Sequence, residues 1–308
     1  MRNNKLKGIL ALIGASLLLG LSFPAQKSAS AVIDPFCLNT LRFFIGVFTL
    51  LLINFIIHRN SPAIYKNENT KYLIKGGILS GFALFMGFSL NQYFISFVDA
   101  GKAGFLTSMY IIIVPLICTL DGTRLNKNIK YGLFTAILGL YLLCGNSASG
   151  KLNINDFGLL ASAIFFAVQI IITGIFAPKT DAIKLSCLQF LTAGILSLPL
   201  MLINTELNLS NIGSAIIPLL FLGIVVTGFA YTMQIYGQKT ANPILATMIL
   251  SCESVFAVIF AYFFLGETLS IKELCGCVIL LCAIIISQLP IGKTVKVQKI
   301  HVSDIHYP

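Results

Sequence analysis

The chain has 308 residues, of which 57% are hydrophobic and only 10% are charged. A soluble domain of this length does not need so much apolar surface, whereas a protein embedded in lipid does. Its net charge of +10 would suggest nucleic acid as a partner for a soluble protein. Because the basic residues flank long apolar runs, we expect a lipid bilayer and no nucleic acid as the surroundings of this chain.

Ten apolar runs predict membrane-spanning helices. About 20 helical residues cross about 30 Å of hydrocarbon, and lipid cannot satisfy the backbone groups of a lone strand. In chain order the predicted spans are residues 8–26, 36–57, 75–98, 103–120, 131–147, 157–177, 185–204, 214–236, 243–265 and 274–290.

The first run has a second interpretation. The sequence MRNNKLK, an apolar stretch and then KSASA are also typical of a cleaved secretory signal peptide. Residues 8–45 align without a gap on residues 158–195, however, so cleavage would delete a helix whose partner in the second half is retained. We therefore predict a retained first helix. This alignment places Arg42 on Thr192.

The similarity between the halves continues beyond these segments. AGFLTSMYIII from Ala103 parallels NPILATMILSC from Asn242, which places Glu253 on Val114, and DGTRLN from Asp121 parallels LGETLS from Leu265.

Five spans in each half is an odd number, so the second copy enters the membrane inverted. We predict an all-α polytopic membrane protein with ten transmembrane helices in two inverted five-helix repeats. The first repeat is residues 1–150, the second is 151–290, and a basic cytoplasmic tail is 291–308.

The distribution of basic residues predicts the orientation. If the N-terminus is cytoplasmic, sixteen of the 21 Lys and Arg residues fall in inner loops and tails, and one, Arg42, lies inside a span. The remaining four fall in outer loops, namely Lys27, Lys102, Lys151 and Lys272. Such a bias indicates that both termini are cytoplasmic.

The sequence offers little for catalysis. Histidine occurs only at His58, His301 and His306, outside the predicted spans, and the cysteines all lie in apolar runs. The pair Cys275 and Cys277 lacks the spacing and the second pair of a zinc site. No phosphate-binding loop is present. We expect no enzyme activity, no cofactor and no metal.

Polar groups inside the spans are the candidates for a site. A charge at a helix centre costs about 2.5–3.5 kcal/mol on insertion scales, so Arg42 and Glu253 should face the protein interior or water. Glu253 lies near mid-membrane, where it could carry protons. Either charge could instead be a structural hydrogen-bonding centre. Uncharged candidates for lining a cavity, or for joining helices, are Asn91, Gln92, Tyr110, Gln169, Gln189, Tyr231 and Gln234.

Three segments resemble a known family. QYFISFVDAGKAGFLTSMYIIIVPL at 92–116, ASAIFFAVQIIITGIFAPKTD at 161–181 and ANPILATMILSCESVFAVIFAYFFLGETLS at 241–270 are similar to the EamA repeats of the drug/metabolite transporter superfamily, ten-helix branch. Members usually have Glu-Pro-Val-Phe-Ala where this chain has Ser254 after Glu253. They usually have Gly-Glu where the first repeat has Gly122-Thr123, whereas Gly266-Glu267 is intact.

The resemblance implies an inner-membrane permease or exporter for a small metabolite, such as an amino acid, that works by alternating access around a cavity between the halves. Partners would be that metabolite, possible protons and lipid, in a monomer or homodimer. The alternative is a channel or a non-catalytic structural membrane protein, since these share apolar helices and repeats. An intramembrane enzyme would need a carboxylate pair or a nucleophile with its base, and the spans do not supply either.

Overall fold

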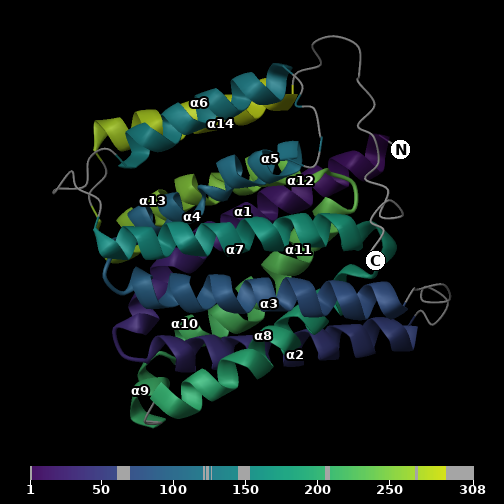
Figure 1. The fold of residues 1–308 in the computed structure, drawn as a ribbon. Coiled ribbons are helices and arrows are strands. Elements are labelled where there is room, and N and C mark those ends of the chain that lie inside the picture. Colours follow the sequence, from purple (N-terminus) through teal and green to yellow (C-terminus); the bar gives the residue numbers. More distant parts are fainter. Residues whose placement is uncertain are drawn as a thin grey trace.

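The computed structural model describes residues 2–60, 70–120, 122, 125, 127–144, 153–204, 209–267 and 270–288. Throughout these residues the regular structure is helical (Figure 1). The basic tail predicted at 291–308 and loop residues 61–69 lie outside the described part of the chain. The helices are α1 (Arg2–Ser30), α2 (Pro35–Asn60), α3 (Thr70–Ile95), α4 (Ala100–Thr107), α5 (Tyr110–Leu120), α6 (Lys127–Cys144), α7 (Ile154–Phe176), α8 (Ala182–Asn204), α9 (Leu209–Ser214), α10 (Ile216–Leu220), α11 (Tyr231–Gln238), α12 (Pro243–Leu250), α13 (Cys252–Leu265) and α14 (Ile271–Gln288), with a short 3₁₀ turn η2 (Ala177–Lys179) and a π-helical segment η3 (Phe221–Ala230).

Eight stretches within the described residues are long and apolar enough to cross a membrane, and each overlaps one predicted span. They are Asn4–Ser30, Pro35–Ile57, Thr70–Ile95, Ala100–Leu120, Ile154–Lys179, Ala182–Ile203, Ile216–Gln238 and Pro243–Leu265. The stretch Asn4–Ser30 packs along α13 and α11, so the first apolar run is an integral part of the bundle. The protein is therefore a multi-pass, all-helical membrane protein.

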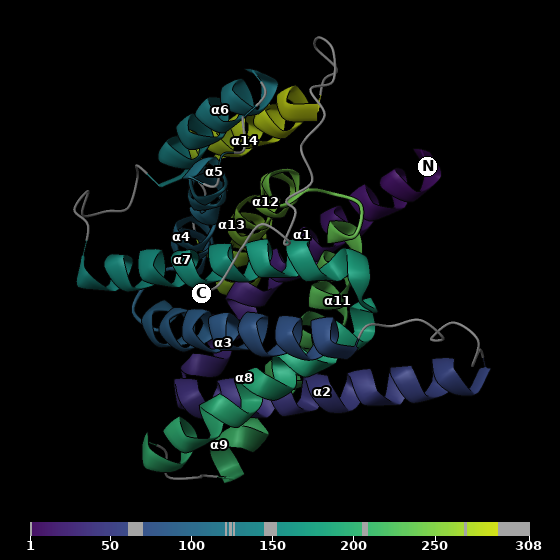
Figure 2. The ribbon, with the colours of Figure 1, turned by 45° about the vertical axis from the view of Figure 1, so that its right-hand side comes forward.

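The two other predicted spans, 131–147 and 274–290, correspond to α6 and α14. These 18-residue helices pack side by side along one edge of the bundle, as Figures 1 and 2 both show. They are not among the eight spans identified by length and composition in the described residues. At 1.5 Å per residue each is about 27 Å long, slightly shorter than the hydrocarbon core.

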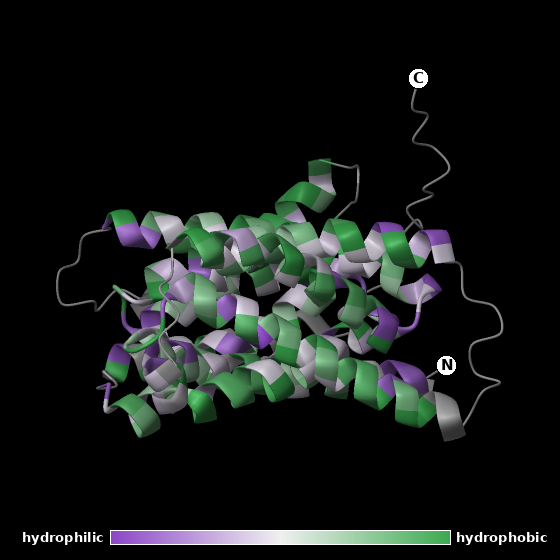
Figure 3. Ribbon diagram, turned by 90° about the horizontal axis from the view of Figure 1, so that it is seen from below, coloured by the Kyte–Doolittle hydropathy of each residue, from purple (hydrophilic) through white to green (hydrophobic). Residues whose placement is uncertain are grey.

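The outward surface of the bundle is apolar, as lipid requires. Large side chains such as Phe48, Phe55 and Ile203 are exposed on α2 and α8. Figure 3 shows hydrophilic residues mainly at the helix ends and in the interior, between outer helices that are predominantly hydrophobic. A helix surface of this kind is stable in lipid because the acyl chains are as apolar as leucine.

Helix caps correct the predicted alignment of α2 with α8. Asp34 accepts hydrogen bonds from the first backbone N–H groups of α2, and Asp181 does the same for α8. The two caps differ by 181 − 34 = 147 positions, so Arg42 corresponds to Gln189. The prediction that Arg42 falls on Thr192 was wrong by three residues, close to one helical turn, because an apolar helix pattern nearly repeats after each turn.

A similar correction applies to the fourth span of each half. Asp99 precedes α4 and Asn242 caps α12, a difference of 242 − 99 = 143 positions. Glu253 therefore corresponds to Tyr110 and not to Val114, as the sequence had suggested. The expected pairing of the segments at Asp121 and Leu265 agrees with the structure, since Gly122 and Gly266 share a left-handed backbone with φ of 82° and 69°.

Small residues bring α1, α4 and α13 into close contact. Ser254, Ala257 and Ala261 form a stripe of small residues on α13, and all three are buried. A Cβ on Gly104 of α4 would lie 2.6 Å from the Cβ of Ala257, and a Cβ on Gly20 of α1 would lie 2.7 Å from the backbone oxygen of Glu253. The backbones therefore approach closely, as small residues allow in membranes.

Candidate functional site

Two interrupted helices cross the centre of the molecule. The span Ala100–Leu120 is divided into α4 and α5 at Ser108, and the span Pro243–Leu265 is divided into α12 and α13 at Ser251. Figure 2 shows these four short helices together, between the α6–α14 pair and α7. Since Ser108 and Ser251 are also separated by 143 positions, the two interruptions are equivalent points of the repeats.

Serines lie at both interruptions. Ser108 and Ser251 bond through their hydroxyls to backbone oxygens three or four residues earlier, and Ser254 bonds to the backbone oxygen of Ser251 through both its hydroxyl and its N–H. Bonds of this type tighten and bend helices. The second interruption therefore forms although the family's usual proline is replaced by Ser254.

A small cavity of about 30 Å³ lies beside these interruptions. Every residue that lines it is buried, and the lining is drawn from both halves of the chain. The lining residues are Leu19, Ser22, Phe23, Gln26, Arg42, Phe88, Asn91, Thr107, Tyr110, Phe166, Gln169, Ile170, Val226, Tyr231, Gln234, Leu250 and Glu253. This volume is enough for a water molecule or two but not for a metabolite, so the structure has its central cavity closed.

Of the predicted site residues, all except Gln92 and Gln189 line this cavity. Gln189 is one layer behind it and accepts a hydrogen bond from the lining residue Gln169 at 3.3 Å. Gln92 donates to the hydroxyl of Ser30 at 2.6 Å. These two amides therefore join helices around the cavity without facing it.

Glu253 occupies the first turn of α13, directly after the interruption. Its Oε1 accepts a hydrogen bond from the Tyr110 hydroxyl at 2.9 Å and lies 3.4 Å from the Ser108 hydroxyl, whose single hydrogen is shared with the Gly104 backbone oxygen at 2.8 Å. Since Tyr110 is its counterpart in the first repeat, this contact joins equivalent positions of the two halves. The acid is 5% exposed and depends on these donors for its charge.

Arg42 is completely buried on α2. Its Nη1 donates to Oε1 of Gln26 at 3.1 Å, and its guanidinium carbon lies 4.3 Å from the centre of the Phe88 ring. Its Nε and Nη2 have no partner, and no ion pair joins it to Glu253, both residues being among those described. The two charged lining residues are thus held separately, each by uncharged neighbours.

Amide side chains connect the surrounding helices. Gln234 of α11 donates to Gln169 of α7 at 3.1 Å, and Gln169 in turn donates to Gln189 of α8. In the other half, Asn91 of α3 donates to the Thr107 hydroxyl at 2.8 Å. Because Asn91 and Gln234 are also separated by 143 positions, both repeats place an amide at the same point of the cavity wall.

Four aromatic rings form a closed set next to Arg42. Phe43 contacts Phe88 and Phe190, and Tyr231 contacts the same two rings, with centroid separations of 5.1–5.8 Å. Phe43 and Phe190 are equivalent in the repeats, as are Phe88 and Tyr231. The rings therefore bring equivalent positions of the two repeats into contact and fill the space beside the cavity with apolar surface.

Sequence reasoning missed Gln26, Thr107 and Ser108, which bond to Arg42, Asn91 and Glu253 respectively. Gln26 stood at the predicted end of the first span, whereas α1 continues to Ser30. Its spacing of four residues from Ser22 in an apolar run was the available signal, since these two side chains bond to each other on one helix face. Thr107 and Ser108 looked like ordinary small residues.

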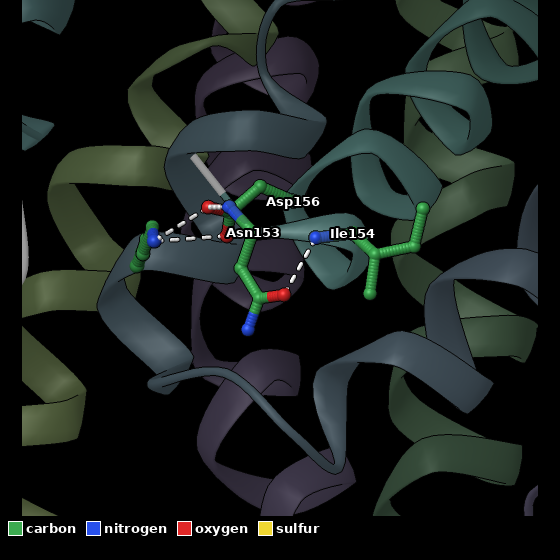
Figure 4. A network of polar contacts seen from close by, with 4 residues as sticks. Asn153, Ile154 and Asp156 are labelled. Carbon is green, nitrogen blue, oxygen red and sulfur yellow. Dashed lines mark hydrogen bonds and ion pairs between the residues drawn. The ribbon is translucent and has the colours of Figure 1, made fainter. Parts of the chain in front are cut away.

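A polar network ties the halves together at one end of the bundle. Lys102 of α4 pairs with Asp156 of α7 at 2.8 Å, and Figure 4 shows Asp156 within the cap of α7 beside Asn153. Glu267 accepts from the backbone N–H groups of Ala100 and Gly101 at the start of α4. This end of the bundle carries the loops predicted to be outside, so the contacts hold the two repeats together there.

Comparison with known proteins identifies the class. The EamA-like transporter family matches residues 6–145 and again residues 153–289, so the chain belongs to this family and carries its repeat twice. The family is one of membrane transporters, in agreement with the apolar helices and with the polar cavity between the halves.

Individual relatives agree with that assignment. A protein named "Uncharacterized transporter" from Archaeoglobus fulgidus is 30% identical over 284 residues, which cover 91% of this chain and 85% of the relative. "Uncharacterized transporter YoaV" from Bacillus subtilis is 26% identical over 295 residues, covering 93% and 98% respectively. A solved crystal structure has a TM-score of 0.72 at 17% identity and covers 94% of this chain and 97% of its own, which shows a shared fold.

Proposed function

We propose that the protein is a secondary transporter that exports or exchanges a small metabolite, an amino acid or a similar compound, across the inner membrane. The observation that carries this proposal is the buried cavity containing Arg42 and Glu253, built from both repeats at the two interrupted helices. Interrupted helices at mid-membrane are typical of transporter sites that lie between repeats. A charge in such a place is costly and is retained where it has a function.

The proposed architecture has ten transmembrane helices, with α6 and α14 as the fifth and tenth and with both termini in the cytoplasm. Five crossings in each half make the second repeat inverted. Alternating access then follows if the halves tilt about the axis where equivalent residues meet, at Tyr110 with Glu253 and at the aromatic rings. The closed cavity is one stage of this cycle, and opening to either side would admit the substrate.

Glu253 is the proposed proton carrier. Its carboxylate accepts from the Tyr110 hydroxyl and contacts the Ser108 hydroxyl, and it has no cation within ion-pair distance among the described residues. A carboxyl group in such surroundings can accept a proton when the cavity opens to one side and release it on the other. Export would then be driven by the proton gradient.

Reconstitution into liposomes tests the proposal against a channel. A carrier shows saturable counterflow, in which unlabelled substrate inside the vesicles drives labelled substrate to accumulate transiently. A channel equilibrates the label without counterflow, and a structural protein does neither. The substrates to test are selected by growth of a deletion strain on amino acids and toxic analogues. For these substrates, channel behaviour or the absence of transport would contradict a carrier.

A further inference from the structure

The hydrogen bonding of Arg42 is incomplete in one specific direction. The side chain is 0% exposed and lines the cavity, yet only Nη1 has a partner, the Gln26 amide oxygen. Nε and Nη2 are buried donors without an acceptor. Burial of unpartnered donors on a charged group is costly, and such groups in native proteins call for an explanation.

The two unpartnered atoms belong to the same edge of the guanidinium. Their N–H bonds run parallel, which is the arrangement that binds both oxygens of a carboxylate at once. The centre of the Phe88 ring lies 4.3 Å from the guanidinium carbon, and this ring offers no acceptor oxygen to Nε or Nη2. Gln26 and Phe88 therefore fix the orientation of the group while leaving its fork available to a ligand.

The charges in the cavity favour an anion at this position. Among the lining residues only Arg42 and Glu253 carry charge, and they are not paired. Glu253 already has Tyr110 and Ser108 as donors, whereas the charge of Arg42 has only a neutral amide and aromatic rings around it. An incoming carboxylate would satisfy both donors and compensate the buried positive charge.

We propose that Arg42 binds the carboxylate group of the transported metabolite through Nε and Nη2. This inference rests on the proposed transport function and specifies its substrate class as carboxylate-bearing metabolites. Gln26 is a positioning residue, since it holds Nη1 and so aims the fork. The equivalent position in the second repeat is Gln189, which cannot supply a charge, so the carboxylate is bound on one side of the repeat axis only.

Ligand binding to the purified full-length protein tests the proposal. The probes are small carboxylic acids, both L-amino acids and 2-oxo acids, each with its matched primary amide, together with inorganic phosphate. Thermal unfolding in detergent reports binding, because a ligand that binds the folded state raises Tm. We expect at least one acid to stabilise the protein and its amide to bind at least about tenfold more weakly, because the amide lacks the charge that completes the Arg42 fork.

Variants assign the discrimination to Arg42. Arg42→Gln should abolish the preference for acid over amide, and Arg42→Lys should retain only part of it because lysine lacks the planar fork. Since the acid and the amide are compared within one variant, a general loss of stability does not affect the ratio. Lys27→Gln is the matched control. Lys27 is a cation that does not line the cavity, so its removal should leave the ratio of acid to amide binding unchanged.

Four outcomes would overturn the assignment, and the first three concern which ligands bind and which variant discriminates between them. They are equal binding of acid and amide by the native protein, an unchanged preference in Arg42→Gln, and stabilisation by phosphate alone. Absence of stabilisation by every acid in the panel would overturn it as well. These failures are distinct from failure of the transport proposal, which depends on counterflow and would be contradicted by channel behaviour even if Arg42 bound carboxylates.

Discussion

At the residue scale, the site depends on two buried charged residues whose hydrogen-bond partners differ. Glu253 meets hydroxyl donors from its equivalent segment, Tyr110 and Ser108. Arg42 meets an amide on one edge and has no protein partner on the other. Protein groups around Glu253 can therefore stabilise its negative charge. Arg42, in contrast, has hydrogen-bond donors that only a bound ligand would satisfy. This difference is the basis for assigning protons to Glu253 and substrate to Arg42.

The first prediction concerns Glu253→Gln. The amide is nearly isosteric and can still accept from Tyr110, so we expect the variant to fold and to perform substrate counterflow. It cannot release a proton, so accumulation driven by a pH gradient should be lost. The measurement is uptake into liposomes with and without an imposed gradient. If the variant accumulates substrate as the native protein does, with the same pH dependence, Glu253 does not couple transport to protons.

A second acidic residue provides the control for that experiment. Glu267 lies outside the cavity lining and caps the start of α4 through Ala100 and Gly101. Glu267→Gln should lower stability by about 1–2 kcal/mol, since hydrogen bonds to a charged acceptor are the stronger kind. Gradient-driven accumulation should persist. Loss of coupling in both variants would mean that the effect is general and not specific to Glu253.

At the element scale, small residues allow the interrupted helices to approach one another closely. Gly104 of α4 meets Ala257 of α13, and Gly20 of α1 meets the backbone near Glu253. Membrane helices gain from such close approach because lipid provides no hydrophobic force to bring them together. The position of Glu253 relative to Tyr110 therefore depends on the small side chains at these contacts.

Gly104→Ala tests this dependence. The new Cβ would lie 2.6 Å from the Cβ of Ala257, closer than two such atoms can approach, so the helices must separate. We expect a loss of about 1–3 kcal/mol of stability, as for other overpacked cores, measured by thermal unfolding in detergent. Adding Ala257→Gly should recover part of the loss. If Ala257→Gly restores no stability to the Gly104→Ala variant, the contact between α4 and α13 is not tight.

A third prediction concerns the ion pair between α4 and α7. Lys102 is 18% exposed and Asp156 is 0% exposed, so Lys102→Met would leave a buried carboxylate with only backbone and capping contacts. Breaking a buried pair from one side costs about 3–5 kcal/mol, and partial exposure of the lysine places this case at the lower end. Unfolding should show this loss, and the double variant Lys102→Met with Asp156→Asn should be more stable than the single one. Equal stability of the single variant and the native protein would show that the pair is solvated.

At the scale of the whole molecule, the distribution of charge predicts orientation. The bias of Lys and Arg toward one set of loops predicts that both termini lie in the cytoplasm, by the rule that inner loops are basic. The end of the bundle that carries Lys102 and Glu267 would then face outward. Under this orientation, the proposed alternating access would require these inter-repeat contacts to break and re-form.

Cysteine accessibility checks the orientation. Single cysteines are placed in the segment 61–69 between α2 and α3 and after Lys293, in a chain otherwise free of cysteine. A thiol reagent that cannot cross membranes should label both only after the cells are broken, with a cysteine in place of Lys151 as the outer control that reacts in intact cells. Labelling of either inner position in intact cells would reverse the proposed topology.

The sequence by itself determined the class of the protein, because burial in lipid imposes long apolar helices and a repeat of such helices is visible as a pattern. It also placed Arg42 and Glu253 among the site candidates, since charges inside such helices are rare enough to stand out. It did not determine the exact pairing of the repeats. An apolar helix looks much the same when shifted by one turn, so Thr192 and Val114 were matched where Gln189 and Tyr110 belong.

Only the tertiary structure decided which polar groups meet. The bond between Tyr110 and Glu253 joins residues 143 positions apart, and no local pattern specifies it. The interruptions at Ser108 and Ser251 are not visible in the sequence either, because a serine such as Ser80 makes the same bond to its own helix without interrupting it. The unpartnered edge of Arg42 is likewise a property of the assembled cavity, because hydrogen-bond satisfaction depends on which helices pack around a side chain and not on its neighbours in sequence.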